Sequence, residues 1–337
     1  MVSVTDQADA AVFNGTRLTS LEVCAGAGGL ALGLEQAGFD PLLLLDNRRE
    51  ACETLRLNRP DWDVRQIDLL EFDPIDHQQV YDVDLLVAGL PRLKAKAAVS
   101  RTRDDDSELG LVKATVMLVY GVQPRAILID NVPDLVTGST YAPLREYVDA
   151  ELTHLGYSLR WFVMNAADYG VPQDRKHGIL VAFKEDGADR FEIPPTWIDA
   201  ELTVGNVLHE SMSAGGWVQA VEWARQANRL APTLVGGSWE RGGADLGPTG
   251  SKTAWARMGV DAGTVADRVP GSDFVWIPDG GRDGMVKLTV DQAAILQGFP
   301  SSWTIAGRKT ARYRQVGNAM PPPLAKALGT AIRTAIS

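Results

Sequence analysis

Residues 18–37 read LTSLEV-CAGAGG-LALGLEQA, and this stretch decides the fold. We expect a buried strand over 18–23 and a helix over 30–37, because the first segment is largely apolar and the second is rich in small and apolar residues. The turn between them holds three glycines, which let the backbone approach a ligand closely. A strand, a Gly-rich turn and a helix N-terminus together suit a nucleotide-like molecule.

Further apolar segments alternate with helical ones along the first half of the chain. A helix is expected over 48–58, and strands are expected over 42–45, 64–67, 83–88 and 126–129. This alternation is typical of parallel strands joined by crossover helices. The sequence therefore predicts an open α/β fold with a Rossmann-like parallel sheet.

The composition and the periodicity of the sequence change after about residue 190. Residues 190–286 are rich in Gly, Pro, Trp and Ser, with weak periodicity, and helical patterning returns from residue 287. We expect a flexible lead-in over 1–17, a main domain built from 18–189 and 287–337, and a smaller irregular domain over 190–286. No internal repeat is visible.

Composition limits the classes of protein that are possible. The chain of 337 residues has 45% hydrophobic and 23% charged residues, which is ordinary for a soluble globular protein. No apolar run is long enough to span a membrane, and the N-terminus lacks a secretory pattern. The two cysteines, Cys24 and Cys52, form no metal-binding spacing and no disulfide framework, so we expect no metal and a cytoplasmic location.

The formal net charge of −10 is a poor electrostatic footprint for gripping DNA unaided. One cluster of basic residues could form a local DNA-binding face, but the composition favours a helix face that is simply exposed to solvent. This cluster consists of Arg308, Lys309, Arg312 and Arg314.

Two acidic residues follow the second and third predicted strands. Asp46 is placed to accept hydrogen bonds from ribose hydroxyls, and Asp68 is placed to face an adenine amino group. The six-residue GxGxxG spacing is missing, which argues against NAD. The ordered set of Gly-rich turn and two acids favours a nucleoside-containing cofactor over a turn that serves packing alone.

Four separated blocks resemble motifs of the DNA cytosine-5 methyltransferases, in that family's order. They are LEVCAGAGGLALGLEQAGF (21–39), NAADYGVPQDR (165–175), LQGFP (296–300) and YRQVGNAMPP (313–322). An ordered set of this kind is highly specific, and it spans roughly residues 18–335. The resemblance implies S-adenosyl-L-methionine (SAM) as cofactor, double-stranded DNA as partner, and a target recognition domain over the irregular residues.

The resemblance also assigns residues to the cofactor. The implied SAM-binding residues are Cys24, Ala25, Gly26, Gly28, Gly29, Leu30, Asp46, Asn47, Asp68, Leu69, Gly89, Asn318 and Ala319. The candidates for DNA contact in the recognition domain are Arg225, Arg229, Trp239, Arg241, Lys252 and Arg257. Surface and loop packing is the alternative role for this second set.

Members of this family methylate C5 of cytosine, which is a weak nucleophile. A Cys thiolate adds to C6 of a flipped cytosine, a Glu holds the ring, and an Arg supports it from the other side. Here the family's Pro-Cys appears as Pro91-Arg92, its Glu-Asn-Val begins with Asp130 and Asn131, and its Gln-x-Arg-x-Arg ends in Arg175 and His177. Arginine remains protonated and cannot attack carbon.

These changes leave three hypotheses. The chain could be a pseudo-methyltransferase that binds SAM and DNA, either alone or as the regulatory subunit of an active methyltransferase. It could modify DNA by altered chemistry, with His177 as a conceivable general base. It could be an active cytosine-5 methyltransferase with an unrecognised nucleophile, but neither Cys24 nor Cys52 is expected to face a flipped base. We also expect Arg92 to pair with Asp130 and fill the emptied pocket.

Overall fold

The computed structural model of the chain describes residues 15–93, 105–197, 202–236, 243–278 and 281–337. Its contacts divide the chain into two compact units. The sheet unit comprises residues 12–164, 176–195 and 324–337, and the helical unit comprises residues 165–175 and 196–323. Residues 1–14 of the predicted lead-in lie outside the described residues.

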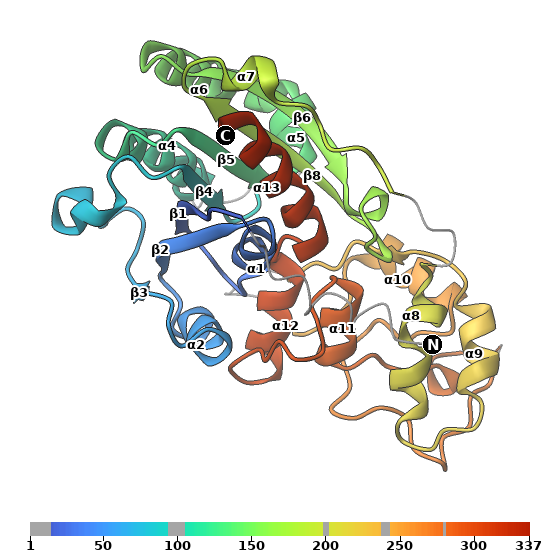
Figure 1. Cartoon of the computed structure of the whole chain (residues 1–337). Helices are drawn as coiled ribbons and strands as arrows, with labels where there is room; N and C mark the ends of the chain where they lie inside the picture. The colour runs from blue at the N-terminus through green and yellow to red at the C-terminus, as the bar shows by residue number, and fades with distance from the viewer. Residues whose placement is uncertain (1–14, 94–104, 198–201, 237–242, 279–280) are drawn as a thin grey trace. The chain divides into compact units, whose positions relative to one another are not determined.

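The sheet unit is built on seven strands in the order β3-β2-β1-β4-β5-β8-β6 (Figure 1). The strands are β1 (Leu18–Val23), β2 (Phe39–Asp46), β3 (Val64–Gln66), β4 (Leu85–Gly89), β5 (Ala126–Asn131), β6 (Ser158–Asn165) and β8 (Lys176–Phe183). The pairs from β3 to β5 are parallel, and β8 runs antiparallel to β5. The carboxyl ends of five parallel strands therefore share one edge.

Helices cover both faces of this sheet. They are α1 (Gly29–Gln36), α2 (Arg49–Asn58), α4 (Asp105–Val122), α5 (Pro133–Thr137), α6 (Ala142–His154), α7 (Gly187–Arg190) and α13 (Pro322–Ile336). Helices α4 and α6 bury Val116, Val119 and Val148 in one core with Leu21 and Leu86 of the sheet. Nearly continuous apolar strands are expected for a parallel sheet that is covered on both sides.

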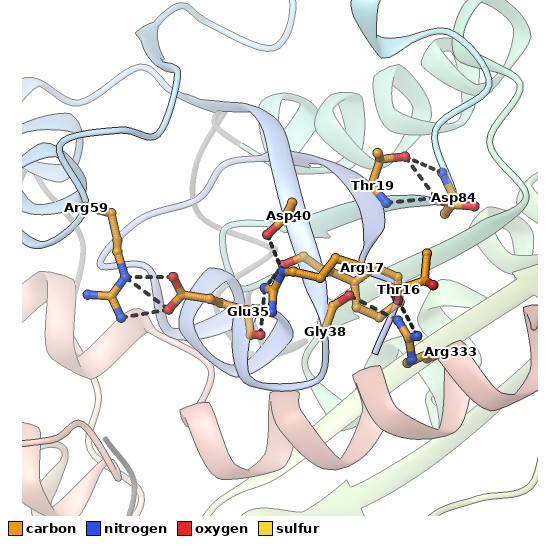
Figure 2. Close-up of polar contacts among 10 residues, drawn as sticks. Thr16, Arg17, Thr19, Glu35, Gly38, Asp40, Arg59, Asp84 and Arg333 are labelled. Atoms are coloured by element: carbon orange, nitrogen blue, oxygen red, sulfur yellow. Dashed lines mark hydrogen bonds and ion pairs between the residues drawn. The ribbon is translucent and has the colours of Figure 1, made fainter. Parts of the chain in front are cut away.

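Three arginines secure the connection between α1 and β2, as Figure 2 shows. Arg59 binds both carboxylate oxygens of Glu35, with nitrogen–oxygen distances of 2.7 Å. Arg17 donates to the carbonyl of Glu35 at 3.0 Å and to the Asp40 carboxylate at 2.5 Å, and Arg333 donates to the carbonyls of Gly38 and Thr16. The far end of α1 is thereby fixed, which in turn fixes the direction of its N-terminus.

The helical unit contains short helices and a two-stranded sheet. Its elements are β7 (Gln173–Asp174), α8 (Val204–Ser213), α9 (Ala220–Gln226), β9 (Ala231–Pro232), α10 (Thr249–Arg257), α11 (Val290–Leu296) and α12 (Lys309–Asn318). Strands β7 and β9 are parallel. Trp223 and Trp255 are among the largest fully buried side chains and form much of the unit's core.

The predicted strands and helices of the first half are confirmed within a few residues. The structure departs from the predicted strands in two respects. β2 begins at Phe39 rather than at residue 42, and an antiparallel strand, β8, extends the sheet. By contacts, residues 287–323 group with the irregular segment, whereas the sequence assigned them to the main domain.

Helices α1 and α13 approach each other closely at a glycine. A Cβ atom on Gly329 would lie 2.8 Å from the Cβ of Ala37 and 2.8 Å from a methyl carbon of Leu34. We predict that Gly329→Val lowers the free energy of unfolding by about 1–3 kcal/mol, because overpacking outweighs the gain in helix propensity. Urea unfolding followed by circular dichroism measures this change.

Thr330→Val is the matched control, because Thr330 is the exposed neighbour of Gly329 in the same helix. Its effect should stay within about 0.5 kcal/mol. Equal effects of the two substitutions would contradict close packing of α1 against α13.

Candidate functional site

The Gly-rich turn at the end of β1 has a backbone conformation that favours glycine. Cys24, Gly26 and Gly28 have φ angles of 55°, 55° and 80°, all in the left-handed region. Gly28 is the N-cap of α1 and offers no side chain to cap it. A Cβ on Gly26 would meet no neighbouring atom closer than 4.0 Å, so this side of the turn is open to a ligand.

Asp46, at the end of β2, holds this turn in place. One carboxylate oxygen accepts the Gly26 N–H at 2.8 Å, and the other accepts the Arg48 N–H at 2.8 Å. Burial raises the pKa of Asp46, and the two N–H donors oppose that shift. A ribose contact from Asp46 stays a prediction, and the structure adds a positioning role for the same carboxylate.

Asp68 lies in the loop after β3, beside the next predicted cofactor residue. Its carboxylate accepts a hydrogen bond from the side-chain amide of Asn47 at 2.8 Å and another from the Leu70 N–H at 3.0 Å. Asp68 and Asn47 are thus brought together as the sequence predicted for one pocket, while Leu69 is buried next to them.

Glu22 is a functional candidate that the sequence prediction missed. It lies in β1, is 1% exposed, and one of its carboxyl oxygens has no hydrogen-bond partner. Burial raises the pKa of Glu22 to about 8, the Ala31 N–H at the start of α1 lowers it, and Asp46 adds to the rise. A charged residue between Leu21 and Val23 of a predicted buried strand was the signal available in the sequence.

The loop after β4 is clamped by Asn131, the last residue of β5. The Asn131 side chain accepts the Leu93 N–H at 3.0 Å and donates to the Pro91 carbonyl at 3.1 Å. Arg92 stands between these two anchored residues, at the place where the family resemblance expects the nucleophile. Asn131 therefore fixes the backbone of residue 92 at the carboxyl edge of the sheet.

Asp130 and His177 form a buried pair beside this loop. His177 Nδ1 lies 2.7 Å from a carboxylate oxygen of Asp130, and the residues are 3% and 8% exposed. Asp130 thus bonds to His177 and also attracts the Arg92 guanidinium, so the expected filling of the pocket by Arg92 and Asp130 stays a prediction. Burial lowers the pKa of Arg92, and the nearby Asp130 carboxylate opposes this shift.

Neither cysteine is prepared to act as a nucleophile. Burial raises the pKa of the Cys24 thiol, and the carboxylates of Asp46, Asp68 and Glu22 raise it further. Burial likewise raises the pKa of Cys52 to about 11, and its thiol donates to the Asp46 carbonyl. Since the thiolate is the reactive form, both thiols are poor nucleophiles near neutral pH.

In the helical unit, side chains of the QDR segment bind the backbone of Leu234, two residues after β9 ends. The Gln173 side chain accepts the Leu234 N–H at 2.8 Å, and the Arg175 guanidinium donates to the Leu234 carbonyl at 2.6 Å. Gln173 also donates to the Leu296 carbonyl at 3.3 Å. Arg175 is 1% exposed, so the structure gives it a positioning role, and its predicted contact with a base stays a prediction.

The remaining predicted residues lie in different parts of this unit. Asn318 is exposed at the end of α12, and the carbonyl of Ala319 accepts a hydrogen bond from Gln297 at 2.6 Å. Of the DNA-contact candidates, Arg225, Arg229 and Arg257 are exposed, and Lys252 pairs with an aspartate. Trp239 and Arg241 lie outside the described residues.

Comparison with known proteins identifies the family. The C-5 cytosine-specific DNA methylase model matches residues 18–334. The chain belongs to this family. It is 37% identical to the type II methyltransferase M.NgoMIV of Neisseria gonorrhoeae, covering 95% of this chain and 98% of that protein. It is 42% identical to the type II methyltransferase M.NaeI of Lentzea aerocolonigenes, covering 95% of this chain and 76% of that protein.

Solved structures of methyltransferases share the fold. The Entamoeba histolytica methyltransferase EhMeth matches with a TM-score of 0.65 at 13% identity, covering 94% of this chain and 98% of that chain. The S. pombe Dnmt2 methyltransferase matches with a TM-score of 0.59 at 18% identity, with the same coverage. At these identities the likeness establishes a SAM-dependent methyltransferase fold.

SAM is the methyl donor of this family, and the residues of the sheet unit fit it. The open side of the Gly26 turn leaves room for a ligand, and the α1 N-terminus lies directly beyond it. The carboxyl groups of Asp46 and Asp68 at the ends of β2 and β3 suit a ligand with positive charge. When bound, SAM supplies an electrophilic methyl group, and these side chains would hold it at the end of β1.

Two further findings concern only the described residues. None of the helices there is long and apolar enough to cross a membrane. In the same residues, no group of three or more His, Cys, Asp or Glu side chains is arranged to hold a metal ion.

The buried Glu22 carboxyl predicts a pH dependence of stability. Its folded-state pKa of about 8 is above the ordinary value of 4.5, so the folded chain keeps a proton that the unfolded chain has released. The stability that this proton contributes is fully present below about pH 4.5 and is lost as pH rises through about 8. Relative to Glu22→Gln, the wild type should lose up to about 1.4 kcal/mol per pH unit in that window.

Urea unfolding of both proteins at intervals from pH 5 to pH 9 measures this difference. The substitution keeps the shape of the side chain and removes its titration. If the two stability curves stay parallel across the range, Glu22 does not carry the buried proton.

Proposed function

We propose that this chain is a pseudo-methyltransferase, which binds SAM and double-stranded DNA but does not transfer the methyl group. The observation that carries the proposal is Arg92 between Pro91 and Leu93, at the position of the family's nucleophilic cysteine. The first step of the family's chemistry needs a nucleophile that adds to C6 of cytosine. An arginine side chain does not supply one.

The pocket around Arg92 supports the same conclusion. The family's glutamate is replaced by Asp130, which is one methylene shorter, and one of its oxygens is engaged by His177. A base that needs two hydrogen bonds from this carboxylate would have to displace the imidazole. The three changes occur together at adjacent strand ends, whereas the glycine-rich turn keeps its open shape.

The charge distribution of the helical unit supports a role beside a partner. Several cations of this unit are already neutralised by aspartates: Lys309 by Asp267 at 3.0 Å, Lys252 by Asp245 at 3.2 Å, and Arg312 by Asp291 at 2.5 Å. The net charge of −10 also disfavours binding to phosphates, so a partner would supply part of the DNA contact. The chain would therefore act best as a regulatory subunit of an active methyltransferase in a restriction-modification system.

A second candidate is an enzyme with altered chemistry on DNA. The observation that favours it is the Asp130–His177 pair, since a buried carboxylate that binds one imidazole nitrogen orients the ring as a general base. Such a pair could activate a hydroxyl or a water rather than cytosine C6. An active cytosine-5 methyltransferase with a nucleophile elsewhere in the chain is the third candidate.

Mass spectrometry of DNA nucleosides separates these candidates. Purified protein is incubated with SAM and genomic DNA of several base compositions, and the DNA is digested and weighed. We expect no modified nucleoside, together with calorimetrically measurable SAM binding. A 5-methylcytosine peak would overturn the proposal, and a different modified nucleoside would establish the altered enzyme.

Restoring the lost side chains should restore the reaction. The combined variant Arg92→Cys, Asp130→Glu and His177→Arg is expected to produce 5-methylcytosine, because the nucleophile and its carboxylate partner return to a clamped loop. The matched control replaces Arg92 by Ser in the same background and should remain inactive. Methylation by the serine variant would mean that position 92 is not the site of the nucleophile.

A further inference from the structure

A buried carboxylate in the helical unit holds one edge of an exposed arginine. The side chain of Asp261 is 7% exposed, whereas that of Arg282 is 72% exposed. One oxygen of Asp261 accepts hydrogen bonds from Nε and Nη2 of Arg282, at 3.1 and 3.0 Å, and from the Gly263 N–H at 2.9 Å. Its other oxygen lies 3.8 Å from Nζ of Lys287. The guanidinium is therefore fixed by its Nε–Nη2 edge.

The backbone beside this pair leaves room for the guanidinium. A Cβ atom on Gly263 would lie 2.0 Å from Nη2 and 3.1 Å from Cζ of Arg282, so any other residue at position 263 would displace the guanidinium. The segment that carries Arg282 is tied to the segment that carries Asp261. The Val286 N–H donates to the Gly259 carbonyl at 3.0 Å, and the Asp261 N–H donates to the Val286 carbonyl at 2.8 Å. Both partners of the pair thus lie on connected backbone.

The bonds to Asp261 leave the outer end of the guanidinium available. A guanidinium has five N–H donors in a rigid planar fork. Nε–H and one N–H of Nη2 point to Asp261, so two parallel N–H groups remain at the tip, one on Nη1 and one on Nη2. Within the described part of the chain, Asp261 is the acceptor that the Arg282 side chain binds. The tip can therefore donate to two adjacent acceptors of a ligand.

Two acceptor pairs of DNA match this fork: two oxygens of a phosphate, and O6 with N7 of a guanine in the major groove. Binding to phosphates depends on net positive charge, and the Asp261 carboxylate cancels the charge of Arg282 at close range. Readout of a base depends instead on a fixed direction of the donors, which the same carboxylate supplies. The pair is therefore better suited to a base edge, and the exposed Lys287 beside it suits the phosphates.

We propose that Arg282 is a specificity-determining residue that binds O6 and N7 of a guanine in duplex DNA, and that Asp261 is its positioning residue. This inference rests on the DNA binding of the proposed function and does not depend on methyl transfer. Arg282 is not among the DNA-contact residues that the sequence predicted, because its pairing with Asp261 joins positions 21 residues apart.

Selection from a library of random duplexes tests the assignment. The full chain is incubated with the library, bound duplexes are recovered and sequenced, and dissociation constants are measured for the selected sequence and its single-base variants. The wild type should select a guanine at a fixed position. Arg282→Ala should lose the discrimination at that position, by about 5- to 100-fold, and keep it at the other selected positions.

Two further variants test the positioning of the guanidinium. Gly263→Ala should reduce the guanine preference although Arg282 and Asp261 both remain, because the added methyl group displaces the guanidinium. Asp261→Asn should reduce the preference and at the same time strengthen binding to unrelated duplexes, because a negative charge is removed beside the DNA. A merely structural role of Asp261 would weaken binding to all duplexes alike.

Arg268→Ala is the matched control, because Arg268 is another exposed arginine of the same unit. It should leave the guanine preference unchanged. A uniform loss of affinity in Arg282→Ala, with a salt dependence reduced by about one charge, would assign Arg282 to a phosphate and overturn the inference. An unchanged guanine preference in Arg282→Ala would overturn it as well.

The behaviour of the wild type separates the inference from the proposed function. If the wild type binds duplex DNA without selecting a guanine, the role of Arg282 is refuted and DNA binding stands. If the wild type binds no duplex, DNA binding itself is refuted, and the inference falls with it.

Discussion

Backbone groups in the loops at the carboxyl edge of the sheet need hydrogen-bond partners, and side chains from the neighbouring strand ends supply them. Asp46 accepts the Gly26 N–H and so shapes the turn after β1. Asn131 binds the loop after β4 on both sides of residue 92. Each strand end thus fixes the loop beside it, and the two candidate sites of the sheet unit depend on these bonds.

The two candidate sites of the sheet unit present different groups to a ligand. Around the Gly-rich turn, the open backbone, the helix N-terminus and the acidic groups remain suited to a cationic cofactor. Around residue 92, the same clamped geometry presents a guanidinium and a carboxylate that is bound to histidine. The hydrogen bonds of Asn131 hold the backbone on both sides of residue 92 and do not involve the side chain of that residue. The conformation of the loop therefore does not depend on which side chain stands at position 92.

The sequence predicted most of the sheet because its strands are short apolar runs bounded by turn residues. It predicted a Gly-rich turn after the first strand, and the structure adds that Gly26 and Gly28 there have positive φ angles. It could not predict the partner of Asp130, because His177 lies in β8, which pairs with β5 in antiparallel register over a long sequence separation. The contacts of Gln173 and Arg175 with Leu234 also join residues far apart in the sequence and could not be predicted. The burial of Glu22 depends on the neighbouring strands and on α1, which lie at a distance in the sequence as well.

The most direct test of the central claim, that no side chain of this chain adds to cytosine C6, is covalent trapping. Duplex DNA in which 5-fluorocytosine replaces cytosine holds a methyltransferase in a covalent complex, because fluorine at C5 blocks the elimination that would release the nucleophile. The protein is incubated with this DNA and SAM and its intact mass is determined. We expect no protein–DNA adduct. An adduct would show that a side chain does add to C6, and the modified peptide would identify the nucleophile.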